Sequence, residues 1–186
     1  MIRQPDLLRA EEAACRLLLD EGVSMPVAPL ALLRRRGDVT IHTYAETAER
    51  LGLTEDQFER RCGAADAFTL RQVSEKGVRY AVSYRANGNP ARMNFTLAHE
   101  LGHIVLQHMA SGAAEEREAD HFASCLLCPA PLTKGEKDPA VLAKKCYVSL
   151  TAAKKALDRP ALPVNEALLA ALAQKISTNE GCKRYG

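Results

Sequence analysis

The sequence predicts an α+β fold, in which a small mixed or antiparallel sheet packs against two long helices and further helices lie at both ends of the chain. Three observations support this prediction. Alternating polar and branched apolar residues, typical of half-buried strands, occur in the first half of the chain. Apolar residues at helical spacing dominate residues 94–108 and 115–127. Similar helical patterns begin and end the chain, which completes the α+β class.

The first half of the chain contains short helices and all the expected strands. Helical spacing, with capping residues before the later segments, predicts helices over residues 6–19, 27–33, 45–53 and 54–61. Alternation and strand-type composition predict strands over residues 39–44, 67–73 and 77–84. Residues 45–63 would then be a helical insertion.

The second half of the chain is expected to be helical. A dense turn signal at residues 86–90 separates the last strand from the helix over residues 94–108. The helix over residues 115–127 follows, and residues 138–176 are helical with a break at residues 160–163. We therefore predict two parts, a main domain over residues 1–130 and a C-terminal helical extension over residues 131–186 that packs on it.

Composition excludes several classes of protein. The 186 residues are 47% hydrophobic and 26% charged, which are average values for a folded globular domain. A net charge of +2 is too balanced to indicate a nucleic-acid or membrane surface. No apolar run approaches the roughly 20 residues of a spanning helix, and the first residues lack the apolar stretch of a secretory signal. We expect a cytoplasmic protein with no membrane partner.

The six cysteines are expected to be free thiols, because a chain without an export signal stays in a reducing compartment. Cys125 and Cys128 have the spacing of a metal-binding or redox pair. No second pair follows them, and two leucines lie between them within an apolar helical pattern. We interpret both as buried core thiols.

The segment His99-Glu100-Leu101-Gly102-His103 contains the residues on which the functional prediction depends. His99 and His103 are four residues apart, so on a helix both imidazoles leave the same face and can share one metal ion. Glu100 can reach the water at that metal and act as the general base for attack on a carbonyl. An exposed helix can carry such residues by chance, but the apolar residues around them favour a metal site.

A catalytic zinc ion needs a third protein ligand and an open fourth position. Met109 stands where the metzincin pattern has a third histidine, so that class is excluded. His108, five residues after His103, is expected to turn away from the ligands as a cap or packing residue. Glu116 and Asp120 are four apart on the next helix, so we predict Glu116 as the third ligand and Asp120 as a hydrogen-bond acceptor for a ligand histidine.

Four other residues were assigned on general grounds. Glu115 and Glu118 are interpreted as solvated charges, because charged residues are mostly exposed. A tetrahedral oxyanion would need a donor besides the metal, and Tyr80 and Tyr84 are the available phenols, although strand packing is a competing role. An extended substrate could pair with a free edge of the strand that carries these tyrosines.

The chain resembles the ImmA/IrrE family of metallopeptidases in two segments that occur in the same order, Asn94 to Leu106 and Glu116 to Ala123. Leu126-Leu127-Cys128-Pro129 is similar to the Leu-Leu-Met-Pro ending that the family often has, with cysteine in the methionine position. Weaker similarity extends over residues 6–160.

The resemblance implies a zincin-like fold and a set of roles. In that family two histidines and a downstream glutamate hold zinc, and the glutamate after the first histidine is catalytic. These roles fall on His99, His103, Glu116 and Glu100. The resemblance also implies a protein substrate, because members typically cleave a helix-turn-helix repressor, often encoded beside them on phage or mobile elements.

Two alternative functions are a non-catalytic zinc-stabilised regulator and a DNA-binding regulator that acts through the C-terminal helices. The intact Glu100 argues against the first. For the second, residues 138–157 have a helix-turn-helix character, with basic side chains at Lys144, Lys145, Lys154 and Lys155. The usual turn glycine is absent and the net charge is near neutral, so nucleic acid is not the expected partner.

Overall fold

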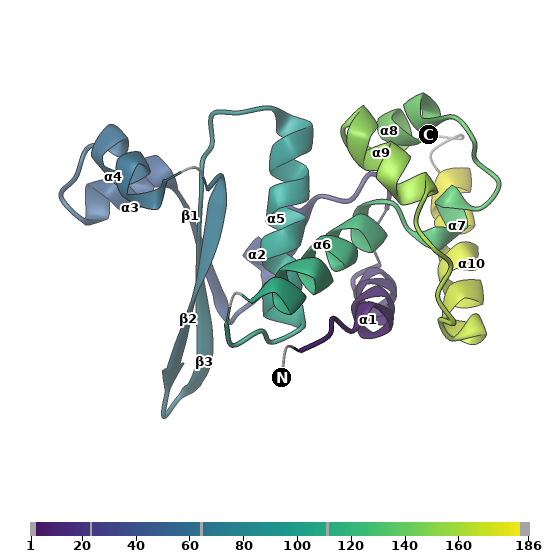
Figure 1. Cartoon of the computed structure of the whole chain (residues 1–186), viewed down its shortest axis with the longest axis horizontal. Coiled ribbons are helices and arrows are strands. Elements are labelled where there is room, and N and C mark those ends of the chain that lie inside the picture. The colour runs from purple at the N-terminus through teal and green to yellow at the C-terminus, as the bar shows by residue number, and fades with distance from the viewer. Residues whose placement is uncertain (1–2, 23, 64, 111, 183–186) are drawn as a thin grey trace.

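The computed structural model describes residues 3–22, 24–63, 65–110 and 112–182, which form ten helices and three strands (Figure 1). The helices are α1 (Leu7–Asp20), α2 (Pro29–Arg35), α3 (Tyr44–Arg50), α4 (Glu55–Cys62), α5 (Pro90–Val105), α6 (Ala113–Leu127), α7 (Ala130–Thr133), α8 (Pro139–Cys146), α9 (Leu150–Leu157) and α10 (Glu166–Cys182). The strands are β1 (Val39–Thr43), β2 (Ala67–Ser74) and β3 (Gly77–Tyr84). The predicted α+β class is confirmed.

The sheet of the described residues has the order β1-β3-β2. Strand β3 runs parallel to β1, with Val39 opposite Tyr80, and antiparallel to β2, with Thr69 opposite Val82. A parallel pair requires a long connection, which α3, α4 and β2 provide between β1 and β3. The sheet is therefore mixed. The free edge predicted for β3 was wrong, because both sides of that strand are paired, and β1 and β2 are the edge strands of this sheet.

The two faces of the sheet pack against different helices. Tyr80 and Val82 of β3 belong to the main core with Leu97 and Leu101 of α5. On the opposite face, Phe68 of β2 lies against the aromatic rings of α3 and α4, in a cluster formed by Tyr44, Phe58 and Phe68. Figure 1 shows α5 and the α3–α4 pair on opposite sides of the strands. Residues 45–63 are thus the helical insertion that the sequence predicts.

Helices α5 and α6 cross closely at Gly102. A Cβ atom at this position would lie 3.0 Å from Phe122 Cδ1 and 3.2 Å from the Ala119 Cα atom, closer than normal packing allows. Glycine therefore lets the two helices approach. Figure 1 shows α6 beside α5, and α1 packs on α6 in turn.

The ends of α5 differ from the prediction. Its first residue is Pro90, because proline is accommodated in a first turn and the Asn89 side chain accepts hydrogen bonds from two backbone N–H groups. The helix ends at Val105, three residues before the predicted end. Gln107 then has φ of 56°, in the left-handed region, and this conformation reverses the chain before His108.

The C-terminal helices share the main core. Leu142, Cys146 and Leu172 belong to the same buried cluster as Leu101 and Phe122. The predicted division at residue 130 stays a prediction. Between α8 and α9, Tyr147 adopts the left-handed conformation that glycine usually supplies at the end of a helix.

The described cysteines Cys15, Cys62, Cys125, Cys128 and Cys146 are free thiols, as predicted, whereas the side chain of Cys182 lies outside the described part of the chain. Cys125 and Cys128 are buried in the core. Within the described ranges, no helix combines the length and apolar character needed to cross a membrane. The cytoplasmic location stays a prediction.

Candidate metal centre

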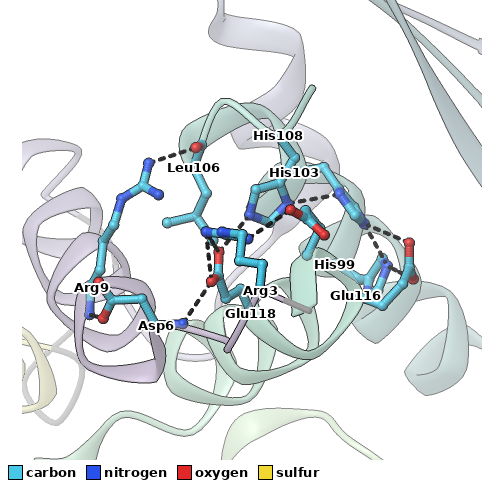
Figure 2. Close-up of polar contacts among 10 residues, drawn as sticks. Arg3, Asp6, Arg9, His99, His103, Leu106, His108, Glu116 and Glu118 are labelled. Atoms are coloured by element: carbon cyan, nitrogen blue, oxygen red, sulfur yellow. Dashed lines mark hydrogen bonds and ion pairs between the residues drawn. The ribbon is translucent and has the colours of Figure 1, made fainter. Parts of the chain in front are cut away.

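Helices α5 and α6 bring three potential ligand atoms together. His99 Nε2 and His103 Nε2 lie 3.0 Å apart on successive turns of α5. Glu116 of α6 places its two carboxylate oxygens 3.3 Å from His99 Nε2 and 3.5 Å from His103 Nε2. Figure 2 shows the three side chains pointing toward one another from the two helices. The residues predicted as ligands are therefore adjacent in space.

This arrangement fits a zinc ion. Ligands about 2.0–2.1 Å from zinc at tetrahedral angles are separated by roughly 3.3–3.5 Å, close to the three distances given above. Two imidazole nitrogens and one carboxylate form a donor set used by catalytic zinc sites. The Glu116 side chain is 47% exposed, so one side of the group faces solvent. A fourth position can therefore be reached from outside.

Asp120, one helical turn after Glu116, lies beside His99. Its Oδ1 atom is 2.9 Å from His99 Nδ1, the ring nitrogen on the side of His99 away from Glu116. A carboxylate at this nitrogen holds the proton there and leaves Nε2 free for a metal. Burial and the neighbouring His99 and His108 lower the pKa of His103 to about 4, so this imidazole is neutral near pH 7.

Glu100 lies beside the three ligand candidates but points toward the sheet. The residue is 7% exposed, and Thr69 of β2 donates a hydrogen bond of 2.5 Å to its Oε2 atom. Burial raises the pKa of the Glu100 carboxyl, with a smaller contribution in the same direction from Glu116, although Thr69 and His99 oppose this shift. A carboxylate with a raised pKa is suited to accept and hold a proton.

A cleft of about 610 Å³ opens over these residues. Residues 67–71 of β2 form one wall, and α5 and α6 form the floor. Tyr80 also lines this cleft. Tyr84, four residues further along β3, is not among the described residues that line it. Met109, 82% exposed, stands at the cleft beside His108.

His108 and Glu118 lie behind His103. The prediction that His108 turns away from the ligands was wrong, and so was the prediction that Glu118 is a solvated charge. His108 Nδ1 is 2.9 Å from His103 Nδ1, because the left-handed turn at Gln107 brings the ring back toward the helix. The Glu118 carboxylate is fully buried and lies 2.9 Å from His108 Nε2. Glu115 is only partly exposed, because its carboxylate pairs with Arg3 at 2.7 Å.

The segment before α1 encloses Glu118. The Asp6 backbone N–H donates to Glu118 Oε1 at 2.6 Å, and Arg3 Nη2 lies 2.9 Å from the same oxygen. Arg9 donates to the Leu106 carbonyl at 2.7 Å, which attaches α1 to the end of α5. Figure 2 shows these contacts beside His103. Although burial alone would raise the pKa of Glu118, hydrogen bonds from Asp6, His108 and Arg3 lower it, so the carboxyl is ionised.

Thr69, His108 and Glu118 are parts of this site that were not predicted from the sequence. A signal existed for Glu118, which lies four residues after Ala114 and four before Phe122 on the buried face of α6. A charge on such a face requires buried partners. The sequence carried no comparable signal for Thr69, because its contact with Glu100 depends on strand order and register.

A second group of metal-type side chains lies between α1 and α6. Glu11, His121 and Cys125 have ligand atoms within 4.8 Å of one another, and Glu11 Oε2 is 3.2 Å from His121 Nε2. Burial raises the pKa of the Cys125 thiol, with the nearby Glu11 adding to this shift. A metal binds a cysteine as the thiolate, and a raised pKa disfavours that form. We therefore interpret this group as a polar link between two helices.

Two comparisons with known proteins bear on this site. A family model described as the IrrE N-terminal-like domain of peptidase family M78 matches residues 65–157, half of the chain. The matched residues include β2, β3, α5 and α6, and so every residue of the candidate centre from Thr69 to Asp120. The comparison with curated proteins gave no match.

Proposed function

Because the chain belongs to the IrrE N-terminal-like family of metallopeptidases, we propose that it is a zinc-dependent endopeptidase with a zincin-like active site and acts in the cytoplasm. One observation carries the proposal, the convergence of His99, His103 and Glu116 beside the buried Glu100 at the floor of a cleft. In this proposal His99, His103 and Glu116 hold zinc, Asp120 orients His99, and Glu100 is the general base.

In this proposal, each residue beside the metal site has a separate role in peptide hydrolysis. Bound zinc supplies a Lewis acid that polarises the peptide carbonyl and makes water more acidic. Glu100 accepts the proton of the attacking water and passes it to the leaving amine. Thr69 holds one oxygen of Glu100, which leaves the other oxygen for this transfer. Of the two predicted tyrosines we retain Tyr80, which lines the cleft and can donate its hydroxyl to the developing oxyanion.

The free edge of β2 is suited to hold an extended substrate. Its backbone groups on that side have no strand partner among the described residues, and residues 67–71 form a wall of the cleft. A peptide that pairs with this edge would place a carbonyl above the zinc ligands. Leu70 and Met109, both largely exposed, provide apolar contacts for substrate side chains beside this edge.

The substrate we propose is a helix-turn-helix transcriptional repressor. This part of the proposal is supported by the resemblance to the ImmA/IrrE family alone. A strand-type substrate site requires an extended or locally unfolded segment, so we expect the cut to fall in a linker or an exposed loop of the repressor.

The proposal is tested by incubating the purified protein with zinc and the helix-turn-helix protein encoded beside it, if one is encoded. We expect discrete fragments that disappear when a chelator removes zinc. Glu100→Gln should retain zinc and abolish cleavage, whereas Glu12→Gln, a change on α1 at a residue that does not line the cleft, should cleave normally. Full cleavage by Glu100→Gln would contradict the proposed mechanism. Zinc-dependent binding of the repressor without fragments would favour the non-catalytic regulator.

DNA contact through α8 and α9 is a second candidate function. Lys144, Lys145, Lys154 and Lys155 are all exposed on this helix pair, which supports the candidate. However, Thr151 and Lys155 also line a second cavity of about 930 Å³ with residues of α5 and α6, so part of α9 faces that cavity. A salt-dependent gel shift with DNA would favour this function, and cleavage without DNA binding would favour the peptidase.

A further inference from the structure

We propose that His108 and Glu118 are positioning residues for the metal centre, because they determine which ring nitrogen of His103 carries the proton. This inference rests on the proposed zinc site. It assigns a role to the turn after α5 and to a buried carboxylate of α6, neither of which contacts the zinc position.

The three side chains form a continuous chain of contacts. His103 Nδ1 lies 2.9 Å from His108 Nδ1, and His108 Nε2 lies 2.9 Å from Glu118 Oε2. The His108 side chain is 4% exposed and that of Glu118 is fully buried. The His103 and His108 rings meet edge to face at an interplanar angle of 78°. Water is therefore largely excluded from both hydrogen bonds.

The direction of the hydrogen bonds follows from Glu118. Its other partners, the Asp6 backbone N–H and the Arg3 guanidinium, can only donate, so the ionised carboxylate accepts throughout. His108 must then donate from Nε2. A His103 ring that binds a metal through Nε2 carries its one proton on Nδ1, so His103 donates from Nδ1 and His108 Nδ1 accepts. The lone pair of His103 Nε2 consequently faces His99 and Glu116.

The Asp120 carboxylate has the same effect on His99 as His108 has on His103. Asp120 accepts from His99 Nδ1, which leaves the Nε2 lone pair of that ring on the same side as that of His103. The two Nε2 atoms are then 3.0 Å apart with no proton between them, and a carboxylate oxygen lies near each. Hydrogen-bond acceptors that face one another repel through their lone pairs, and a metal cation between them removes this repulsion. The surrounding residues thus prepare the group for a metal before it binds.

The chain of contacts extends to the beginning of the described chain. Arg3 and the backbone of Asp6 cover Glu118 and supply the hydrogen-bond donors that a buried carboxylate requires. The segment before α1 therefore supports the metal centre from the side opposite the cleft. Outer hydrogen-bond partners of metal-ligating histidines are typically worth about 10- to 100-fold in metal affinity.

A pair of variants at His108 tests the inference through zinc affinity. His108→Leu removes the acceptor for His103, and we expect zinc binding to weaken about 10- to 100-fold in competition with a chromogenic chelator. His108→Asn keeps an oxygen near the position of His108 Nδ1, so it should retain more affinity than His108→Leu. His42→Leu, the same change on β1 away from the cleft, should bind zinc like the wild-type protein. Equal affinities of His108→Leu and the wild-type protein would overturn the inference.

The proton position can be observed directly in the zinc-free protein. Long-range ¹H–¹⁵N NMR correlations distinguish the two tautomers of a neutral histidine. We expect His103 to carry its proton on Nδ1 in the wild-type protein and in His108→Asn, and to shift toward the Nε2 form in His108→Leu. A general loss of packing would not select one tautomer. A wild-type His103 with its proton on Nε2 would overturn the proposed relay.

Glu118→Gln provides a second test that keeps the size of the side chain. We expect weaker zinc binding than in the wild-type protein, because a neutral amide accepts less strongly from His108. Thermal unfolding of each variant checks that it is folded. If the wild-type protein binds zinc and all three variants bind it equally well, only this inference fails. If the wild-type protein binds no zinc, the proposed function fails and the inference with it.

Discussion

Thr69 on the edge strand β2 donates a hydrogen bond of 2.5 Å to the carboxylate of Glu100 on α5. This contact joins the wall of the cleft to the proposed general base. The register of β2 against β3, with Thr69 opposite Val82, turns the threonine toward the helix. The strand proposed to hold the substrate therefore also orients the residue proposed to transfer the proton.

Thr69→Val should lower the turnover of the proposed peptidase about tenfold, equivalent to roughly 1.4 kcal/mol, because Glu100 loses the group that fixes its orientation. Zinc content should not change, since Thr69 does not contact the ligands. Steady-state cleavage rates and metal analysis measure the two effects. Thr178→Val, an exposed change on α10, is the control. Unchanged turnover in Thr69→Val would exclude this role.

Glu116→Ala should lose bound zinc, because only two imidazoles would remain to hold the ion. The measurement is zinc content after gel filtration. Glu12→Ala on α1 should keep its zinc and serves as the control. Glu118→Ala is unsuitable for this purpose, since Glu118 is buried against His108. Retention of a full equivalent of zinc by Glu116→Ala would show that the third ligand is another residue.

Asp120→Asn should weaken zinc binding about tenfold, within the range found for outer partners of ligand histidines. The amide oxygen of the asparagine can still accept a hydrogen bond from His99 Nδ1, but it carries no negative charge. Competition with a chelator gives the affinity. Asp20→Asn, at the exposed end of α1, removes the same charge far from the site and should leave the affinity unchanged. An Asp120→Asn protein with wild-type affinity would argue against the relay to His99.

Gly102→Ala should destabilise the protein by about 1–3 kcal/mol, because the added methyl group meets the Phe122 ring and the Ala119 backbone. Denaturant unfolding of the zinc-free protein isolates this effect from metal binding. Gly37→Ala is the matched control, since a Cβ atom there has nothing within 4 Å. Equal free energies of unfolding for Gly102→Ala and the wild-type protein would mean that α5 and α6 can move apart at little cost in free energy.

The buried thiols should resist alkylation in the folded protein at pH 8. Burial raises the pKa of Cys15 to about 11, so below that pH the group remains a thiol, which is not the reactive form. Cys62 is the most accessible of the five described cysteines and should react first. Mass spectrometry after iodoacetamide treatment identifies the modified residues. Rapid modification of Cys15 or Cys125 without unfolding would contradict the packing of α1 against α6.

Local patterns were sufficient to predict much of the candidate site. A spacing of four places His99 and His103 on one face of a helix, and the same spacing relates Glu116 to Asp120. Binary patterning also predicted the strands and most helices. Each of these inferences depends on residues within a few positions of one another, which is the range over which helix and strand geometry is fixed.

The errors arose where the answer depends on distant residues. His108 was assigned to a continuing helix, but α5 ends at Val105 and Gln107 reverses the chain. Glu118 was predicted to be exposed, as most charged residues are, and its partner Arg3, 115 residues away in the sequence, could not be foreseen. The free edge was wrongly predicted for β3, because the order of strands in a sheet cannot be read from the sequence of one strand. Local periodicity contains none of this information.

The contacts of Arg3 and Asp6 with Glu118 also have a consequence for folding. They join segments separated by 112 and 115 residues, and the entropy cost of closing a loop grows with its length. During synthesis, Arg3 and Asp6 can enclose Glu118 only after α6 has been made. The support behind His103 is thus completed only after most of the domain exists, so a partly made chain lacks the ordered candidate metal centre of the finished protein.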